Sequence, residues 1–282
     1  MRVKAIGDLA QRADREFFRE IAAGLERVAQ NASTIDDDAR QLWQTRSRGY
    51  AIPKAVAVEE AAKFLILLDV VRCPRCPPDV LGRQLARFRN HLSKGLYAQS
   101  CYWEPATFAE MEQWITRERA DLYLDGPNDV DFIYANQILN GRESTFYVDF
   151  IETDEGHEWT QPRQYDVMLE AGFPYHTAPV ITLVRDFHAL GFADARALEV
   201  VAKMWRSVKM RPEFHRRELR DLNRQTSVAL ENAGLLRGAP DRCLRNVIDR
   251  WLFPLYSLDL SPIRVDRDHL RAVRDNYREM GV

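Results

Sequence analysis

The stretch Tyr50–Val71, YAIPKAVAVEEAAKFLILLDVV, decides the fold. Its density of Ala, Leu and Phe, with a proline close to its start, is typical of a helix buried on most of its faces. After the first turn only Glu59, Glu60, Lys63 and Asp69 carry charge. A buried helix retains such charges where they have partners. The glutamates precede Lys63 by four and three residues, so both carboxylates can reach its ammonium.

The Glu-Glu-x-x-Lys group has two interpretations. It is either a structural ion pair on a solvated seam of the helix, or part of a functional site, because both kinds of network gather charge. The choice depends on what the neighbouring helices bring to it.

The residues before this stretch predict one long amphipathic helix over 14–46. Arg48-Gly49 then turns the chain, so that two long helices form an antiparallel hairpin. Asn31 lies in the middle of the first helix, where it either faces solvent or lines a polar cleft. The helical spacing is carried by Phe17, Phe18, Ile21, Leu25, Val28, Ile35, Leu42 and Trp43.

A third helix is expected from about Leu81 to Cys101. On it Arg87, His91 and Lys94 share one face, either as ordinary surface or as a phosphate site that contains a proton-transfer group. If this face meets the second helix, the charges of both helices are satisfied. We therefore expect one cleft between the second and third helices that contains Glu59, Glu60, Lys63, His91 and Lys94.

The sequence as a whole predicts a mainly α fold with a short extended or β insert. A fourth helix is expected over Phe108–Leu124, and the turn-rich segment at about 125–162 contains a strand-like stretch at 144–151. We assign 1–162 to a helical core with this insert, and 163–282 to a C-terminal helical region packed on it. Further helices are expected at 163–171, 177–190, 193–208, 213–233, 240–251 and 266–279.

Composition bears on which classes of protein this chain can belong to. Of the 282 residues 46% are hydrophobic, which argues against general disorder. The formal net charge is −2, so the chain lacks the overall basic charge that is typical of nucleic-acid-binding proteins. No signal peptide is recognisable, and five charged residues within 51–71 argue against a membrane span. Four cysteines indicate a reducing cytoplasm. Cys73 and Cys76 could clip zinc, but a closed site needs four ligands, so we predict neither metal nor cofactor.

Several motifs together carry a family resemblance over residues 16–162. The motifs are Asn31, Arg48-Gly49-Tyr50, the run Ala57–Leu68, Phe88-x-x-His91-x-x-Lys94, Phe146-Tyr-Val-Asp149 and Trp159-x-x-Pro162. Together they resemble the AbiV-type abortive-infection proteins, which belong to the HEPN superfamily of helical domains.

The resemblance implies an up-and-down core of four or five helices, often dimeric, that serves anti-phage defence. Many superfamily members are metal-independent ribonucleases with the signature Arg, four to six residues, then His. The chain departs from this signature, because only three residues separate Arg87 from His91. A literal match, Arg264 to His269, lies near the C-terminus, outside the family core.

Two classes of function follow. An RNA-cleaving effector, which would halt translation, needs a base, an acid and cations for the phosphorane. The alternative is a non-catalytic interaction or ligand-sensing module. Expected partners are RNA, a second copy of the chain, and a phage protein or regulatory partner. For cleavage, His91 is the base or acid, and Glu59 or Glu60 orients either the lysine or the histidine. The phosphate is held by Lys94, Lys63, Arg87, Asn31 and Arg48.

Overall fold

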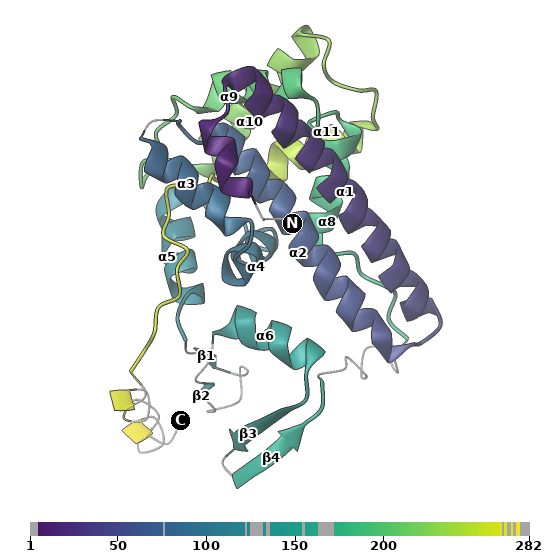
Figure 1. Cartoon of the computed structure of the whole chain (residues 1–282), viewed down its shortest axis with the longest axis vertical. Coiled ribbons are helices and arrows are strands. Elements are labelled where there is room, and N and C mark those ends of the chain that lie inside the picture. The colour runs from purple at the N-terminus through teal and green to yellow at the C-terminus, as the bar shows by residue number, and fades with distance from the viewer. Residues whose placement is uncertain are drawn as a thin grey trace.

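The chain is mainly helical, as expected (Figure 1). A computed structural model describes residues 5–75, 77–121, 123–124, 132–133, 136–153, 156–162, 172–266, 268–269, 272 and 275–276.

A long antiparallel hairpin of α1 (Asp14–Gln44) and α2 (Ala51–Arg72) forms the centre of the fold. A short 3-10 turn, η2 (Arg48–Tyr50), joins them, and another, η1 (Ile6–Gln11), precedes α1. Helix α2 is fully buried from Phe64 onward, whereas its first half alternates between buried and partly exposed residues. Glu59 therefore lies where α2 emerges from the core.

The expected third helix is two helices, so the prediction of a continuous helix over Leu81–Cys101 was wrong. The chain forms α3 (Pro78–Arg87) and α4 (His91–Ser100). The break has a local cause, because the side chain of Asn90 accepts a hydrogen bond from the Ser93 amide at 2.8 Å and caps α4. Asparagine at this position starts helices rather than continuing them.

The insert contains a helix that the sequence did not predict. Helix α5 (Phe108–Glu118) ends six residues before the expected Leu124. Short strands β1 (Tyr123–Leu124) and β2 (Phe132–Ile133) pair. Helix α6 (Gln137–Phe146) then includes the first residues of the expected strand at 144–151, which begins only at Asp149.

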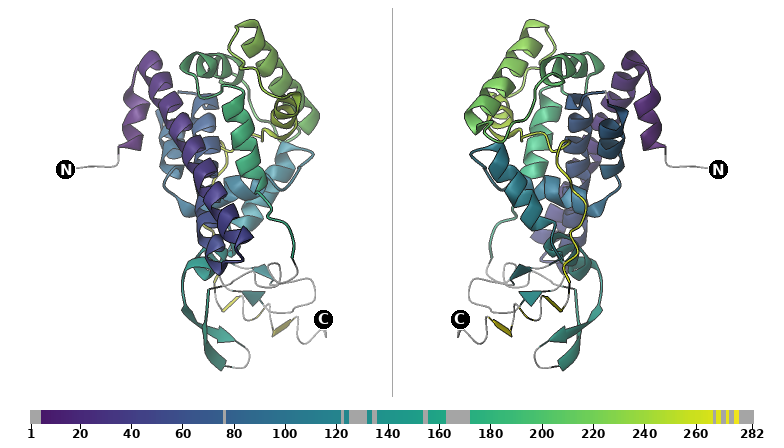
Figure 2. Two further views of the ribbon diagram at one scale, coloured as in Figure 1. Left: turned by 90° about the vertical axis from the view of Figure 1, so that its right-hand side faces the viewer. Right: turned by 90° about the vertical axis from the view of Figure 1, so that its left-hand side faces the viewer.

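Strands β3 (Asp149–Thr153) and β4 (Gly156–Thr160) form an antiparallel hairpin in which Phe150 faces Trp159. The hairpin extends away from the helical body (Figure 2). The expected helix at 163–171 and most of that at 266–279 lie outside the described residues.

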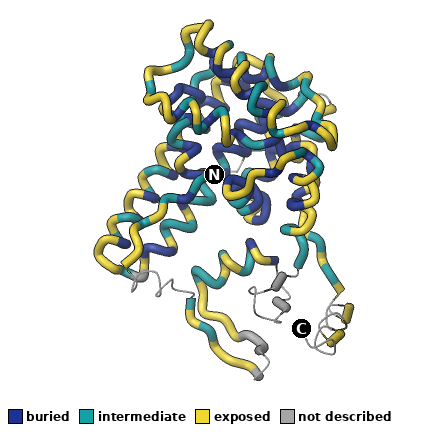
Figure 3. The backbone as a smooth tube through the Cα atoms, turned by 180° about the vertical axis from the view of Figure 1, so that it is seen from behind, coloured by how far each residue is buried: buried dark blue, intermediate teal, exposed yellow. Residues whose placement is uncertain are grey.

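The C-terminal helices share the core of the central hairpin. They are α8 (Pro179–Ala189), α9 (Ala195–Trp205), α10 (Arg216–Asn232) and α11 (Asp241–Arg250). Helices α8 and α9 contact α1 and α2, and buried residues of both halves form one continuous cluster (Figure 3). None of the helices in the described part of the chain is both long and apolar enough to span a membrane.

Candidate functional site

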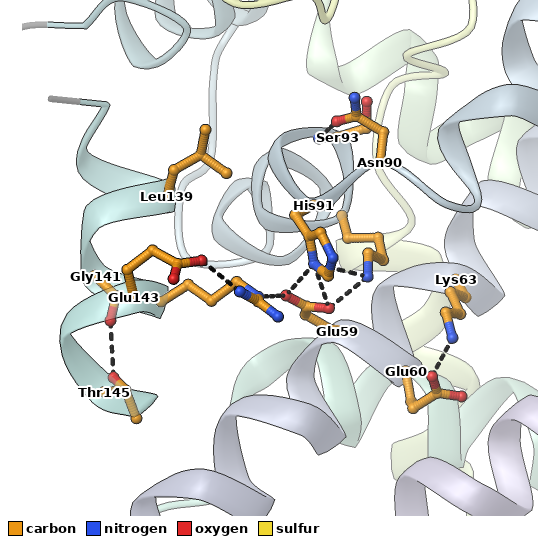
Figure 4. A network of polar contacts seen from close by, with 12 residues as sticks. Glu59, Glu60, Lys63, Asn90, His91, Ser93, Leu139, Gly141, Glu143 and Thr145 are labelled. Atoms are coloured by element: carbon orange, nitrogen blue, oxygen red, sulfur yellow. Dashed lines mark hydrogen bonds and ion pairs between the residues drawn. The ribbon is translucent and has the colours of Figure 1, made fainter. Parts of the chain in front are cut away.

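Glu59 is the centre of a charged cluster formed by three helices (Figure 4). Its carboxylate accepts hydrogen bonds from His91 Nδ1, at 2.9 and 3.0 Å to its two oxygens, and from Arg142 Nε at 2.9 Å. The ammonium of Lys94 also donates to it. We call Glu59, His91, Lys94 and Arg142 the Glu59 cluster. It joins α2, α4 and α6, which are far apart in sequence.

His91 is the accessible member of the Glu59 cluster. Its side chain is 45% exposed, and it is the first residue of α4, directly after the Asn90 cap. Its Nδ1 faces Glu59, which fixes the orientation of the ring. Within the described part of the chain, its Nε2 has no hydrogen-bond partner. A neutral imidazole that donates its Nδ1–H to Glu59 therefore presents Nε2 as a proton acceptor.

Lys94 and Arg142 both pair with the carboxylate of Glu59. The Lys94 side chain is only 6% exposed, and its Nζ lies 3.2 Å from His91 Nδ1. Arg142 also bonds the exposed Glu143 at 2.6 Å. Burial alone would raise the pKa of Glu59, but hydrogen bonds from Lys94 and His91 and their attraction lower that pKa below its usual value. Glu59 is therefore held as a carboxylate.

Helix α6 is positioned to supply Arg142. The side chain of Asn136 caps α6 and donates to the backbone oxygens of Glu118 and Ala120, at 2.8 and 3.2 Å. Ile138 lies against Gly95 of α4, where an added Cβ would come 2.0 Å from Ile138 Cγ2. Only glycine allows this close approach of α4 and α6.

Glu60 lies outside the Glu59 cluster and makes two contacts of its own, with Lys63 and with Asn31. Lys63 donates to Glu60, and Asn31 Nδ2 of α1 donates to the same carboxylate at 3.1 Å. The Lys63 ammonium lies 5.3 Å from the centre of the Phe88 ring. Of the five residues expected in one cleft, the structure thus brings Glu59, His91 and Lys94 together, whereas Glu60 pairs with Lys63 and contacts Asn31 of α1.

Arg87 does not share a face with His91, so that part of the prediction was wrong. It ends α3 and is buried, where it donates to the backbone oxygens of Leu255, at 2.7 Å, and Leu258. A guanidinium occupied in this way holds the chain after α11 rather than a phosphate. The cause is the helix break after Arg87, which separates the two residues that a continuous helix would align.

The remaining candidates lie elsewhere. The side chain of Arg48 is outside the described residues, as is Cys76. Burial raises the pKa of the Cys73 thiol to about 12. Arg264 and His269 are both exposed. Among the described residues, no group of three or more His, Cys, Asp or Glu side chains is placed to hold a metal ion.

Sequence reasoning missed Arg142 because the insert was treated as extended. A signal for it was present, since Asn136 followed by Ile138 and Leu139 matches an N-cap before an apolar turn. An arginine four residues after an apolar residue of that turn then lies on the same face.

A second charged cluster on α2 was also missed. Asp69 accepts hydrogen bonds from Arg72 Nε at 2.8 Å, from the Tyr97 hydroxyl at 2.5 Å and from the Leu255 amide at 2.7 Å. The guanidinium of Arg72 lies over the rings of Trp205 and Trp251. We call Asp69, Arg72 and Tyr97 the Asp69 cluster. An isolated aspartate in an apolar run was the available signal.

Comparisons of this chain with protein-family models, with curated proteins and with solved structures found no match.

Proposed function

We propose that this chain is a metal-independent endoribonuclease of the HEPN type, acting as an AbiV-like abortive-infection effector that cuts RNA and halts translation. The observation that carries the proposal is the orientation of His91. Glu59, which also binds Lys94 and Arg142, holds Nδ1 of this ring, and the side chain of His91 remains accessible. This is the arrangement of a carboxylate-oriented general base.

The reaction follows from these groups. Nε2 of His91 accepts the proton of a ribose 2′-OH, whose oxygen attacks the adjacent phosphorus. The bond to the leaving 5′-oxygen breaks, and that oxygen takes a proton from a general acid, the protonated His91 or water. The products are a 2′,3′-cyclic phosphate and a 5′-hydroxyl end. The ammonium of Lys94 lies 3.2 Å from Nδ1 and Arg142 binds the same carboxylate, so the positive charge of both residues would stabilise the charge that develops on the phosphorane oxygens.

A non-catalytic module is the second candidate, and one observation favours it. Glu59 already binds both Lys94 and Arg142, so the cluster can serve as an ionic clasp that holds α6 on α2 and α4. In that role the same side chains position the insert for a partner without chemistry.

RNA cleavage by a His91→Ala variant separates the two candidates. We expect purified wild-type protein to cut RNA, leaving 2′,3′-cyclic phosphate ends, and the variant to cleave at least about 100-fold more slowly. The matched control is His188→Ala, because His188 of α8 also pairs with a glutamate, Glu26 at 2.8 Å, away from this cluster. Intact RNA with the wild-type protein, or equal cleavage by His91→Ala, would reject the nuclease proposal.

Self-association stays a prediction of the family resemblance. Sedimentation at micromolar protein concentration tests it, and a monomer would count against it.

A further inference from the structure

A pocket lies at the turn of the central hairpin. It is lined by residues at the end of α1 and by residues just before α8, and its volume is about 430 Å³. This size falls within the range of about 300–1,000 Å³ that small-molecule sites occupy. None of its lining residues belongs to the Glu59 cluster.

The charge of this pocket favours an anion. Arg40 and Arg46 line it, and no carboxylate is among its described lining residues. Asp36 of α1 is fully buried and accepts bonds from Tyr175, at 2.7 Å, and from Arg185, at 3.1 Å, and its carboxylate lies 3.9 Å from Arg40 Nη2. Because Arg185 also pairs with Asp36, this carboxylate does not cancel the charge of both lining arginines.

Both arginines are held in particular positions. Arg40 Nη2 donates to Thr177 Oγ1 at 3.0 Å, while its Nε is buried without a hydrogen-bond partner among the described residues. Arg46 has a φ of +56°, a left-handed conformation that residues other than glycine and asparagine rarely adopt. Residues in such sparsely populated conformations cluster at ligand sites, which motivates a role for the Arg46 side chain.

Aromatic rings form the other wall of the pocket. Trp43 packs edge-on against Tyr175, with ring centres 6.1 Å apart, and the hydroxyl of Tyr175 is fixed by Asp36. Phe173 also lines the pocket, and 55% of it is exposed. A rigid aromatic wall with one open ring suits a flat, conjugated group that can stack.

We propose that this pocket binds a nucleotide unit, with its base stacked on Phe173 and its phosphate held by Arg40 and Arg46. Cations alone would suit any anion, and rings alone any apolar group. Their combination around one cavity fits a ligand with a planar base and a phosphate. The nucleotide is either free or part of an RNA chain, and the site does not require the Glu59 cluster to be catalytic.

Isothermal titration of the 282-residue protein with defined probes tests this site. The probes are the four ribonucleoside monophosphates, the matching nucleosides, inorganic phosphate and a single-stranded RNA hexamer. We expect at least one monophosphate or the hexamer to bind at least about tenfold more tightly than nucleoside or phosphate alone. Tighter binding of the hexamer identifies an RNA segment as the ligand, and tighter binding of a monophosphate identifies a free nucleotide.

Two variants assign the binding to this pocket. Phe173→Ala and Arg46→Asn should each weaken the binding at least about tenfold, and Arg46→Lys should retain more of it. Asparagine tolerates the left-handed backbone, so Arg46→Asn removes the charge without unfolding the turn. Trp159→Ala, which truncates an exposed ring on β4, is the matched aromatic control.

The proposal is overturned if no nucleotide or hexamer binds more tightly than phosphate, or if both pocket variants bind as the wild type does. Binding is also measured with His91→Ala. Retained affinity in that variant supports a separate site, whereas loss in His91→Ala with none in the pocket variants would place the ligand at the Glu59 cluster and overturn this assignment.

Discussion

The Glu59 and Asp69 clusters lie on the same helix and use similar chemistry in opposite environments. Each places one carboxylate of α2 against a cation and a side chain of α4. Asp69 is completely buried, and its oxygens accept from Arg72, Tyr97 and a backbone amide. Glu59 lies at the surface end of the buried region and bonds a histidine that reaches solvent.

The difference shows which kind of cluster can perform chemistry. In the Asp69 cluster the polar groups are committed to fixed partners, and burial and the neighbouring aspartate raise the pKa of Tyr97 well above its ordinary value. Such a group holds its proton and its geometry. In the Glu59 cluster, His91 keeps an accessible nitrogen within the described structure, so a substrate can reach it. We therefore assign a structural role to the Asp69 cluster and propose a functional role for the Glu59 cluster.

The largest expected effect comes from removing the charge of Asp69. Asp69→Asn should lower the free energy of unfolding by about 3–5 kcal/mol, because it leaves Arg72 buried without its counter-charge. Urea denaturation measures this change. A variant with the same urea midpoint as the wild type would contradict the structural role of this cluster.

The second prediction concerns the close approach of α4 and α6, on which the Glu59 cluster depends and the Asp69 cluster does not. Gly95→Ala places a methyl group against Ile138 and should cost about 1–3 kcal/mol of stability. It should also displace Arg142 and reduce RNA cleavage, measured beside the melting temperature.

Two further variants sharpen that test. Gly82→Ala is the matched control, because an added Cβ at this α3 position meets nothing within 4 Å. Ile138→Ala combined with Gly95→Ala should restore part of the cleavage by making room. If Gly95→Ala were as stable and as active as the wild type, the contact between α4 and α6 would not position the site.

The sequence predicted the two clusters unequally. The α1–α2 hairpin and the meeting of Glu59 with His91 and Lys94 follow from helical period and charge spacing, because both are local patterns on long helices. The α3–α4 break was missed since a single capping residue, Asn90, decided it. Arg87 was consequently misplaced.

Long-range contacts account for the rest. Arg142 joins the site only because Asn136 and Ile138 dock α6 on the core, which no spacing near His91 indicates. Likewise, Asp69 accepts a hydrogen bond from the Leu255 amide, which lies 186 residues further along the chain. Tertiary packing brings these residues together. Local spacing in a single sequence does not predict such contacts between distant segments.

The smallest expected effect is the pH dependence that Glu59 adds to stability. Burial raises its pKa, but hydrogen bonds from Lys94 and His91 outweigh burial and hold the pKa below the usual value. A lowered folded-state pKa stabilises the protein above the unfolded-state pKa of about 4.3, and this contribution is lost as the pH falls through the lower folded value. Glu59→Gln should therefore cost about 1 kcal/mol at neutral pH, typical of a partly exposed ion pair, and progressively less in acid. Urea midpoints across the acid range measure the difference between variant and wild type.

Glu143→Gln is the control, because its carboxylate also bonds Arg142 but is half exposed. A stability difference for Glu59→Gln that grew as the pH fell would show that this carboxylate is not held ionised by the cluster.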